Sequence, residues 1–221
     1  MAGFIRIPGE FLARIATDSD RIPSLYYNRF RLVRDFFWLR LRFLHRLLKK
    51  YGAGRPACLD FGGGGGVFLP TLAGMFPRVT CIDLETAEAA QVVEHYRLDN
   101  VQLLRQDIRN AQIAPGSFDV IVAADVLEHF RDMTPAAEAL RTWLKDDGYL
   151  FTSVPTESRL YVILRKLFGV EKPADHYHTG AQVESFLAQH GFVMAKRTHC
   201  PLHIGVASLF IVSAWRKSDN R

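Results

Sequence analysis

A glycine-rich segment carries the strongest chemical signal in this sequence. Residues 60–66 read Asp-Phe-Gly-Gly-Gly-Gly-Gly, between an apolar run that predicts a strand at 57–61 and a stretch that predicts a helix to about residue 76. Glycine lets the backbone turn sharply and lets a ligand approach the main chain. The following helix N-terminus offers unpaired N–H groups to a carboxylate or phosphate. The segment therefore predicts a ligand-binding turn.

The spacing of the glycines distinguishes two kinds of nucleotide site. The dinucleotide fingerprint G-x-G-x-x-G needs a third glycine where Val67 stands, or where Phe68 stands in the next possible frame. The spacing G-x-G-x-G fits instead, at Gly62, Gly64 and Gly66. This pattern disfavours a nicotinamide-dependent oxidoreductase, which stays a rival interpretation.

Acidic residues follow three predicted strands, at the end where open α/β sheets bind ligands: Asp83, Asp107 and Asp125. Asp83 lies about 20 residues beyond the glycine turn, where a carboxylate can accept both hydroxyls of a ribose. Any one of these acids alone would more often be a helix cap or a solvated turn residue. Their combination with the glycine turn favours a nucleoside-binding site.

Together these motifs resemble class I S-adenosylmethionine-dependent methyltransferases, in the small-molecule, type 11/12-like branch. The resemblance covers roughly residues 56–215 and includes the segments at 124–129, 153–155 and 175–179. It implies S-adenosylmethionine as methyl donor, S-adenosylhomocysteine as product and no metal ion. The acceptor is expected to be a small molecule, a lipid-like compound or a saccharide, methylated on O, N or C. A protein that binds the cofactor without catalysis is the alternative.

The resemblance also implies particular donor contacts. In the family, an acid at the place of Asp107 takes the adenine amino group, the residue at the place of Ile108 packs on the ring, and the segment around Asp125 lies beside the methionine part. The residues expected to bind the donor are Asp60, Gly62, Gly64, Gly66, Asp83, Leu84, Asp107, Ile108 and Asp125.

Three histidines are candidates for a general base. Methyl transfer is a displacement at an already activated carbon, so the protein must mainly align the acceptor and exclude water. A hydroxyl or amine acceptor also gains from a base, and histidine suits neutral pH. His129, His176 and His178 all follow predicted strand ends. His129 could instead brace its loop, and the other two could be loop residues or substrate contacts.

The chain alternates strands and helices after Pro56, which predicts an α/β, Rossmann-like methyltransferase fold. A mainly parallel seven-stranded sheet with helices on both faces is expected. Residues 56–221 form the expected donor-binding domain, and residues 1–55 an N-terminal helical extension or lid. The expected strands are 57–61, 79–84, 101–105, 118–124, 149–154, 192–198 and 206–215, and the later helices 86–96, 135–144, 158–168 and 182–189.

Most of the positive charge lies in one expected helix at residues 24–51. Residues 21–50 hold nine Lys and Arg and one acid, a balance of +8 that leaves −3 for the rest of a chain of net charge +5. The helix is interpreted as a lid with solvated cations, with Tyr26 and Tyr27 lining the donor pocket. Alternatively it lies on an anionic membrane, with Trp38 as an interfacial anchor. Basic charge is the only feature that supports nucleic-acid binding, so this interpretation is the least favoured of the three.

Composition excludes several other classes. The three cysteines are far apart and form no pattern, which argues against a disulfide framework and a zinc site. The N-terminus lacks the apolar stretch of a signal peptide, and residues 204–215 are too short for a helical membrane span. A cytoplasmic protein, peripheral at the membrane if the helix binds lipid, is expected.

Overall fold

The computed structural model describes residues 3–16, 21–158, 161–163, 166, 176–201 and 208–218. Its strands are β1 (Ala57–Phe61), β2 (Arg78–Asp83), β3 (Val101–Arg105), β4 (Phe118–Ala124), β5 (Leu144–Pro155), β6 (Phe192–Cys200) and β7 (Phe210–Lys217). Its helices are α1 (Gly9–Ile15), α2 (Arg31–Tyr51), α3 (Leu69–Ala73), α4 (Ala87–Tyr96), α5 (Thr134–Trp143) and α7 (Gly180–Gln189). Short 3-10 turns lie at η1 (Ser24–Tyr26), η2 (Ile108–Asn110) and η3 (Leu127–His129).

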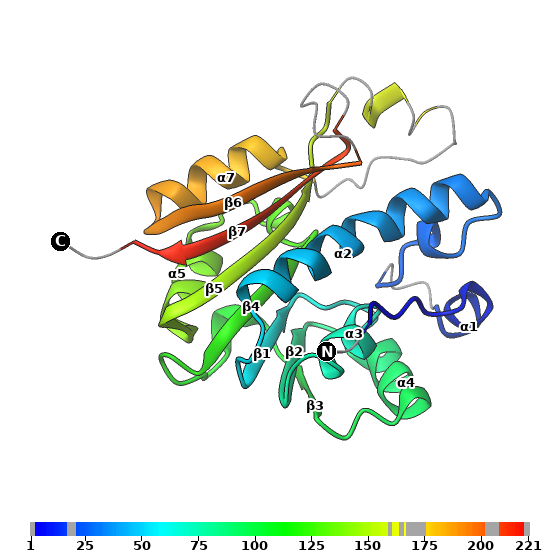
Figure 1. Ribbon diagram of the computed structural model, residues 1–221, viewed down its shortest axis with the longest axis horizontal. Coiled ribbons are helices and arrows are strands. Elements are labelled where there is room, and N and C mark those ends of the chain that lie inside the picture. The colour runs from blue at the N-terminus through cyan, green and yellow to red at the C-terminus, as the bar shows by residue number, and fades with distance from the viewer. Residues whose placement is uncertain are drawn as a thin grey trace.

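The strands form one seven-stranded sheet in the order β3-β2-β1-β4-β5-β7-β6 (Figure 1). Strands β1 to β5 pair in parallel, whereas β7 runs antiparallel to both β5 and β6. This is the mainly parallel, Rossmann-like sheet that the alternating pattern predicted. From β1 the sheet grows in one direction through β2 and β3 and in the opposite direction through β4 and β5. A crevice for a ligand is expected at such a switch point, at the carboxyl ends of β1 and β4.

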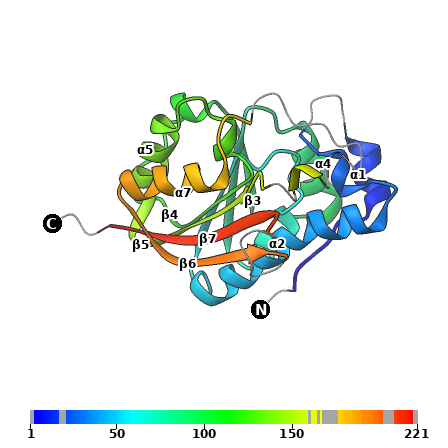
Figure 2. The ribbon, with the colours of Figure 1, turned by 90° about the horizontal axis from the view of Figure 1, so that it is seen from above.

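Helices cover both faces of the sheet, because alternate residues of the central strands point to opposite sides. Cys58 and Val120 pack in one apolar cluster with α1, α2, α3 and α4, whereas Leu59 and Ile121 pack in a second cluster with α5 and α7. Figure 2 shows α5 and α7 on one side of the sheet and α2 on the other. The strands are thus buried on both faces, which explains their uniformly apolar sequence.

Several element bounds differ from those expected. The helix expected to 76 is short, Leu69–Ala73, because positive φ angles continue the turn through Gly66 and Gly74 caps its end. Strand β5 begins at Leu144, which pairs with Phe118 ahead of a register irregularity in the β4–β5 ladder. The helix expected at 158–168 and the first residues of the strand expected at 206–215 lie mostly outside the described residues.

The expected helix at 24–51 divides into η1 and α2. Between them the Asn28 side chain accepts the Phe30 N–H at 2.9 Å, a local turn that competes with helix. Helix α2 then packs along β5 and β7 (Figures 1 and 2). Helix α1, which the sequence pattern did not reveal, buries Phe11, and its ring stacks on His95 of α4 at 4.2 Å between centroids.

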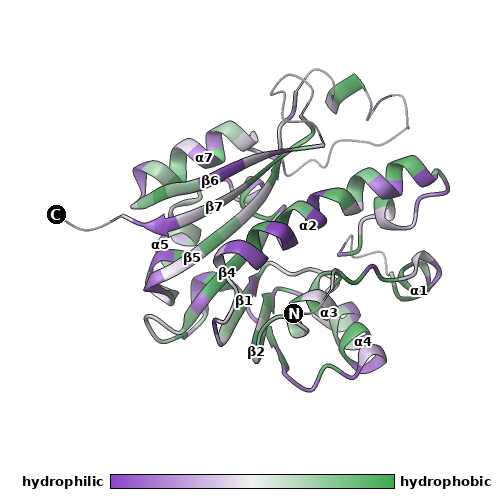
Figure 3. Ribbon diagram, in the orientation of Figure 1, coloured by the Kyte–Doolittle hydropathy of each residue, from purple (hydrophilic) through white to green (hydrophobic). Residues whose placement is uncertain are grey.

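The arrangement of cations on α2 corrects one sequence interpretation. Arg40 is only 3% exposed and Trp38 only 1%, so neither the cation nor the expected membrane anchor reaches the surface. Hydrophobic and hydrophilic residues alternate along this helix (Figure 3). Among the described residues, no helix is long and apolar enough to cross a membrane.

Candidate active site

The glycine turn leaves β1 at the crevice edge of the sheet. Gly62, Gly64 and Gly66 all have positive φ, at 67°, 52° and 75°. Side chains rarely adopt this conformation, which explains why glycine alternates through the turn. A Cβ on Gly62 would also lie 2.3 Å from Val126 Cγ2, in the loop after β4. The turn therefore brings the ends of β1 and β4 into direct contact.

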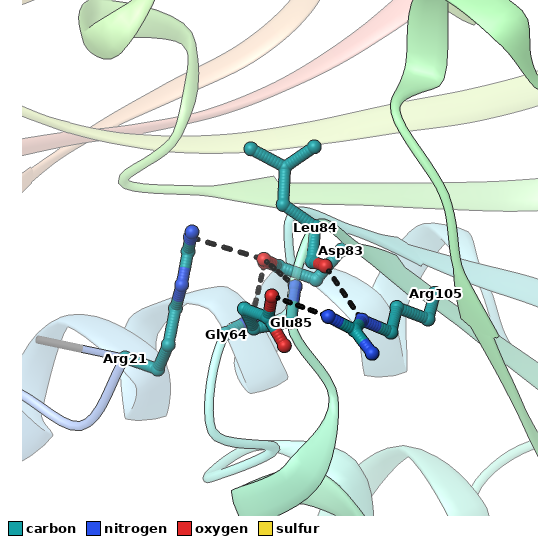
Figure 4. Close-up of polar contacts among 6 residues, drawn as sticks. All are labelled: Arg21, Gly64, Asp83, Leu84, Glu85 and Arg105. Carbon is teal, nitrogen blue, oxygen red and sulfur yellow. Dashed lines mark hydrogen bonds and ion pairs between the residues drawn. The ribbon is translucent and has the colours of Figure 1, made fainter. Parts of the chain in front are cut away.

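Asp83 ends β2 beside this turn and is 7% exposed. Its Oδ2 accepts the Gly64 N–H at 2.8 Å, and its Oδ1 accepts the Glu85 N–H at 3.3 Å. The Arg21 Nη1 atom, from the segment before α2, lies 3.0 Å from Asp83 Oδ1 (Figure 4). The carboxylate is thus fixed by two backbone N–H groups and faces Arg21.

Leu84 follows Asp83 and is unusually exposed for leucine, at 52%. Arg105 of β3 holds this loop, because its Nε donates to the Leu84 carbonyl at 3.3 Å and its Nη2 to Glu85 Oε1 at 2.8 Å (Figure 4). The Leu84 side chain is therefore an apolar surface held outside the core beside the Asp83 carboxylate.

Asp60 lies beneath the turn and is 3% exposed. Burial, followed by the negative charge of Asp83, raises the pKa of the Asp60 carboxyl to about 7. Its Oδ2 atom is buried and makes no hydrogen bond among the described residues. An orphaned buried carboxyl oxygen beside an open turn fits a ligand that brings positive charge.

Asp107 and Ile108 lie at the rim beyond β3. The Asp107 side chain accepts hydrogen bonds from the Arg109 guanidinium and backbone N–H, and these lower its pKa. Ile108 is partly buried and packs at the edge of the α5 and α7 cluster. Both positions lie past the end of β3, as expected from the sequence.

Asp125 follows β4 in a strained conformation, with φ at 52° in a residue other than glycine. Ser153 of β5 supports this backbone: its carbonyl accepts the Asp125 N–H at 2.7 Å and its hydroxyl donates to Asp125 Oδ1 at 3.2 Å. Arg40 donates to the other carboxylate oxygen. Strain of this kind persists only where surrounding contacts enforce it and is concentrated at functional sites.

The Arg40 guanidinium lies buried among aromatic rings and also donates to Tyr26 Oη at 2.9 Å. Its carbon lies 3.6 Å from the Phe37 ring centroid and 5.4 Å from that of Phe210. Burial raises the pKa of Tyr26 to about 12, against the opposing charge of Arg40. Tyr26 contacts Arg40, and its expected place in the donor pocket stays a prediction. The sequence interpretation missed Arg40 because it counted that residue with the solvated cations.

The structure brings together two of the three candidate histidines. The His129 and His176 rings lie 4.6 Å apart between centroids, nearly perpendicular. The Tyr177 N–H donates to the Glu128 carbonyl at 2.9 Å, which holds the segment after β5 against η3. His178 lies apart from the pair, with Nε2 3.3 Å from the Arg131 carbonyl. Asp175, part of the same sequence motif, lies outside the described residues.

Two acids, the buried Glu128 and the partly buried Glu157, complete this cluster. Glu157 Oε1 lies 3.4 Å from His176 Nδ1, and Glu157 itself has a φ of 52°. One ligand atom each of Glu128, His129 and His176 lies within 4.8 Å of the others, close enough to share a cation. Sequence spacing alone did not reveal this cluster, because its members follow different strands. Glu157 was missed since it stands in no recognisable motif.

A family model described as a methyltransferase domain matches residues 27–198, which is more than half of the chain. The chain therefore belongs to this methyltransferase family, as its glycine turn and acids predicted. It is a class I, S-adenosylmethionine-dependent methyltransferase by fold and family, and S-adenosylmethionine is its cofactor. The buried Asp60 oxygen and the open glycine turn fit this cationic nucleoside.

Part of the chain is similar to curated O-methyltransferases. The chain is 32% identical over 136 residues to the ubiquinone biosynthesis O-methyltransferase of Albidiferax ferrireducens, covering 59% of this chain and 52% of that protein. Identity to the protein of the same name from Xanthomonas euvesicatoria is 34% over 119 residues, covering 52% and 48%. The chain thus spans about half the length of these relatives.

Solved structures confirm the fold. The N-methyltransferase NodS from Bradyrhizobium japonicum, in complex with S-adenosylhomocysteine, has a TM-score of 0.64 at 22% identity, covering 94% of this chain and 97% of that one. The 1,6-didemethyltoxoflavin-N1-methyltransferase of Burkholderia thailandensis has a TM-score of 0.65 at 21% identity, covering 99% and 94%. The PH0226 protein of Pyrococcus horikoshii reaches 0.70 at 18% identity, covering 92% and 100%.

Proposed function

We propose that this protein methylates a hydroxyl group of a small, lipid-like acceptor. The observation that carries the proposal is the cluster of Glu157, His176 and His129 beside the strained Asp125, at the same sheet edge as the donor turn. A hydroxyl acceptor needs a base near neutral pH, and an imidazole beside a carboxylate supplies one. The O-methyltransferase names of the curated relatives support the same choice.

The donor residues have distinct tasks in this proposal. S-adenosylmethionine supplies the methyl group on a sulfonium that needs no further activation. Asp83 accepts the ribose hydroxyls, and Leu84 and Ile108 pack on the adenine. Asp107 accepts the adenine amino group. Asp60 and Asp125 hold the methionine part and its charges.

The proton of the acceptor goes to His176. As the oxygen–carbon bond forms and the sulfur–carbon bond breaks, the imidazole takes the hydroxyl proton and becomes a cation. Glu157 fixes the ring through Nδ1 and stabilises that cation, while His129 packs against the ring at 4.6 Å. Glu157 is thus a positioning residue, and His176 the base.

Substitution of His176 tests this assignment. Phenols with and without a long alkyl chain serve as acceptor probes, and formation of S-adenosylhomocysteine is measured in EDTA. We expect His176→Ala to lower kcat at least about a hundredfold, with S-adenosylhomocysteine affinity unchanged. Glu157→Gln should lower kcat less and move the acid limb of the pH–rate profile, whereas the matched control His178→Ala should keep wild-type turnover.

Other outcomes would contradict the proton role. Wild-type turnover in His176→Ala would remove this residue from catalysis. Loss of wild-type turnover in EDTA, restored by a divalent cation, would assign the cluster of Glu128, His129 and His176 to an ion instead of a proton. Methylation of amines but of no hydroxyl would refute the O-methyl proposal.

We further propose that α2 contacts an anionic membrane surface through residues other than Trp38 and Arg40. Its exposed side chains include Leu32 at 64% and Phe36 at 38%, with exposed cations following on the same side of the helix: Arg42, Arg46, Lys49 and Lys50. Apolar insertion and cations are both needed for interfacial binding, and each cation adds about 1 kcal/mol near such a surface. A lipid-like acceptor could then be reached from the cytoplasmic leaflet.

Co-sedimentation with vesicles tests the membrane contact. We expect binding to vesicles rich in phosphatidylglycerol, weaker binding as salt rises, and a loss of binding in the double variant Arg42→Glu, Arg46→Glu. The double variant Arg78→Glu, Arg97→Glu carries the same charge change at exposed positions outside α2 and should bind normally. A wild-type protein that stays in the supernatant at low salt would refute the contact.

A further inference from the structure

Arg21 reaches the donor site from the segment before α2. Its Nη1 lies 3.0 Å from Asp83 Oδ1, and its own carbonyl accepts the Gly65 N–H at 2.9 Å. Figure 4 shows the side chain extending across to Asp83 beside the glycine turn. One residue thus contacts both parts of the structure that the family uses to hold the nucleoside.

The next residue closes the same contact. Ile22 is 4% exposed, and a Cβ built on Gly65 would lie 2.1 Å from Ile22 Cγ1. The Ile22 side chain therefore packs directly on the glycine backbone. The segment that contains Arg21 and Ile22 therefore lies directly on the glycine turn, and a change in the conformation of the turn would move this segment.

The hydrogen bonds of Asp83 leave little room for both the Arg21 guanidinium and a ribose diol. Its Oδ2 accepts the Gly64 N–H, and its Oδ1 faces Arg21. A ribose diol needs both oxygens of such a carboxylate. The Arg21 Nε atom is buried without a hydrogen-bond partner among the described residues, so the guanidinium is incompletely satisfied where it lies.

We propose that Arg21 is a donor-displaced latch, whose guanidinium takes the place of the ribose hydroxyls on Asp83 and holds residues 21–26 over the empty glycine turn. Donor binding expels the guanidinium from Asp83, and the latch lowers donor affinity by the strength of that ion pair. The proposal rests on S-adenosylmethionine binding at this site and adds a residue that sets its affinity.

The other end of the segment is tied to the transfer region. Tyr26 Oη accepts from Arg40, and Arg40 also donates to Asp125 at the end of β4. Residues 21–26 therefore connect the ribose carboxylate with the strained acid near the histidine cluster. Release at Arg21 loosens the cover over both, which gives the acceptor side access once donor is bound.

Calorimetric titration with S-adenosylhomocysteine tests the latch without relying on turnover. We expect Arg21→Gln to bind about three- to tenfold more tightly than wild type, since a partly exposed ion pair no longer competes. Arg21→Lys, which keeps the charge, should restore most of the competition. The control Arg29→Gln removes an exposed cation that stacks on Phe30 and should change nothing.

Two further measurements isolate the mechanism. A 2′,3′-dideoxy analogue of S-adenosylhomocysteine should gain nothing from Arg21→Gln, because it brings no hydroxyls to Asp83. In the empty protein, Arg21→Gln should speed hydrogen exchange at the Gly65 amide. Unchanged affinity in Arg21→Gln would overturn the latch, and weaker affinity would make Arg21 a donor contact. No binding to wild type at all would overturn the latch and the cofactor together, whereas the latch alone fails if wild type binds and Arg21→Gln binds no more tightly.

Discussion

Asp60 shows how a single buried carboxyl can be costly in the empty protein and useful once the donor binds. It lies under the glycine turn with a pKa raised to about 7 by burial and by the charge of Asp83. Near neutral pH it ionises without a partner for its Oδ2 among the described residues. A cationic ligand would supply that partner. Asp60 therefore lowers the folding stability of the ligand-free protein and raises its affinity for such a ligand.

The pH dependence of stability follows from the direction of this shift. Because the folded pKa is above the unfolded value, the folded state holds the proton more tightly. The contribution of Asp60 to stability is therefore fully present below pH 3.8 and is lost as the pH rises to about 7. At higher pH the carboxylate carries a constant penalty.

We expect Asp60→Asn to stabilise the empty protein at pH 8 by an amount on the order of a few kcal/mol, and hardly at all near pH 4. Thermal unfolding at the two pH values checks this. Glu94→Gln, which removes an exposed carboxyl, should shift neither curve. An Asn variant that is less stable than wild type at pH 8 would show that Asp60 is satisfied in the empty site.

At the scale of elements, the glycine turn carries constraints from three sides. Its φ angles are left-handed, Val126 blocks a Cβ at Gly62, and a Cβ at Gly64 would lie 2.9 Å from the Arg21 carbonyl. The turn therefore needs glycine for its own conformation and for the close approach of neighbouring segments.

Gly64→Val should abolish S-adenosylhomocysteine binding, a fall of at least about a hundredfold, while the chain remains folded. The branched side chain strains the left-handed backbone and removes the close approach that a ligand needs. Calorimetry measures the affinity, and circular dichroism monitors the fold. Gly54→Val is the control, since Gly54 is also left-handed, at 78°, but has no atom within 4 Å of a built Cβ. A folded Gly64→Val protein that still binds would exclude the turn from the donor site.

The whole molecule places the glycine turn and the histidine cluster on one edge because parallel strands present their carboxyl ends together. Asp83 ends β2, and Asp125 and Glu157 follow β4 and β5. The order β2-β1-β4-β5 places β4 beside β5 and one strand away from β2. The family and the fold both identify this edge as the cofactor site.

Cofactor selectivity is a property of that assembled edge. We expect S-adenosylhomocysteine at 100 times its dissociation constant to stabilise the protein by about 2.7 kcal/mol, seen as a higher melting temperature. NAD should leave the melting temperature unchanged, because the turn lacks the spacing of a dinucleotide site. A shift with NAD alone would contradict the cofactor assignment.

The sequence by itself determined the sheet, the glycine turn and the family. Strands β1, β3 and β4 have the bounds expected from the sequence, and for β1 and β4 the reason is that a parallel strand buried on both faces leaves a nearly continuous hydrophobic signal. The turn was equally readable, since glycine alternates where the backbone must be left-handed. Both features depend on residues that are close together in the sequence, so the sequence alone is enough to predict them.

The tertiary structure alone decided which side chains meet. Arg40 stands among other cations in the sequence but is buried against Asp125. Trp38 was expected at the surface but is buried in the core. Two further contacts join residues from separate parts of the chain: Arg21 contacts Asp83, and Glu157 contacts His176. Such pairs depend on how segments cross at the edge of the sheet, a long-range geometry for which residue spacing along the chain carries no signal.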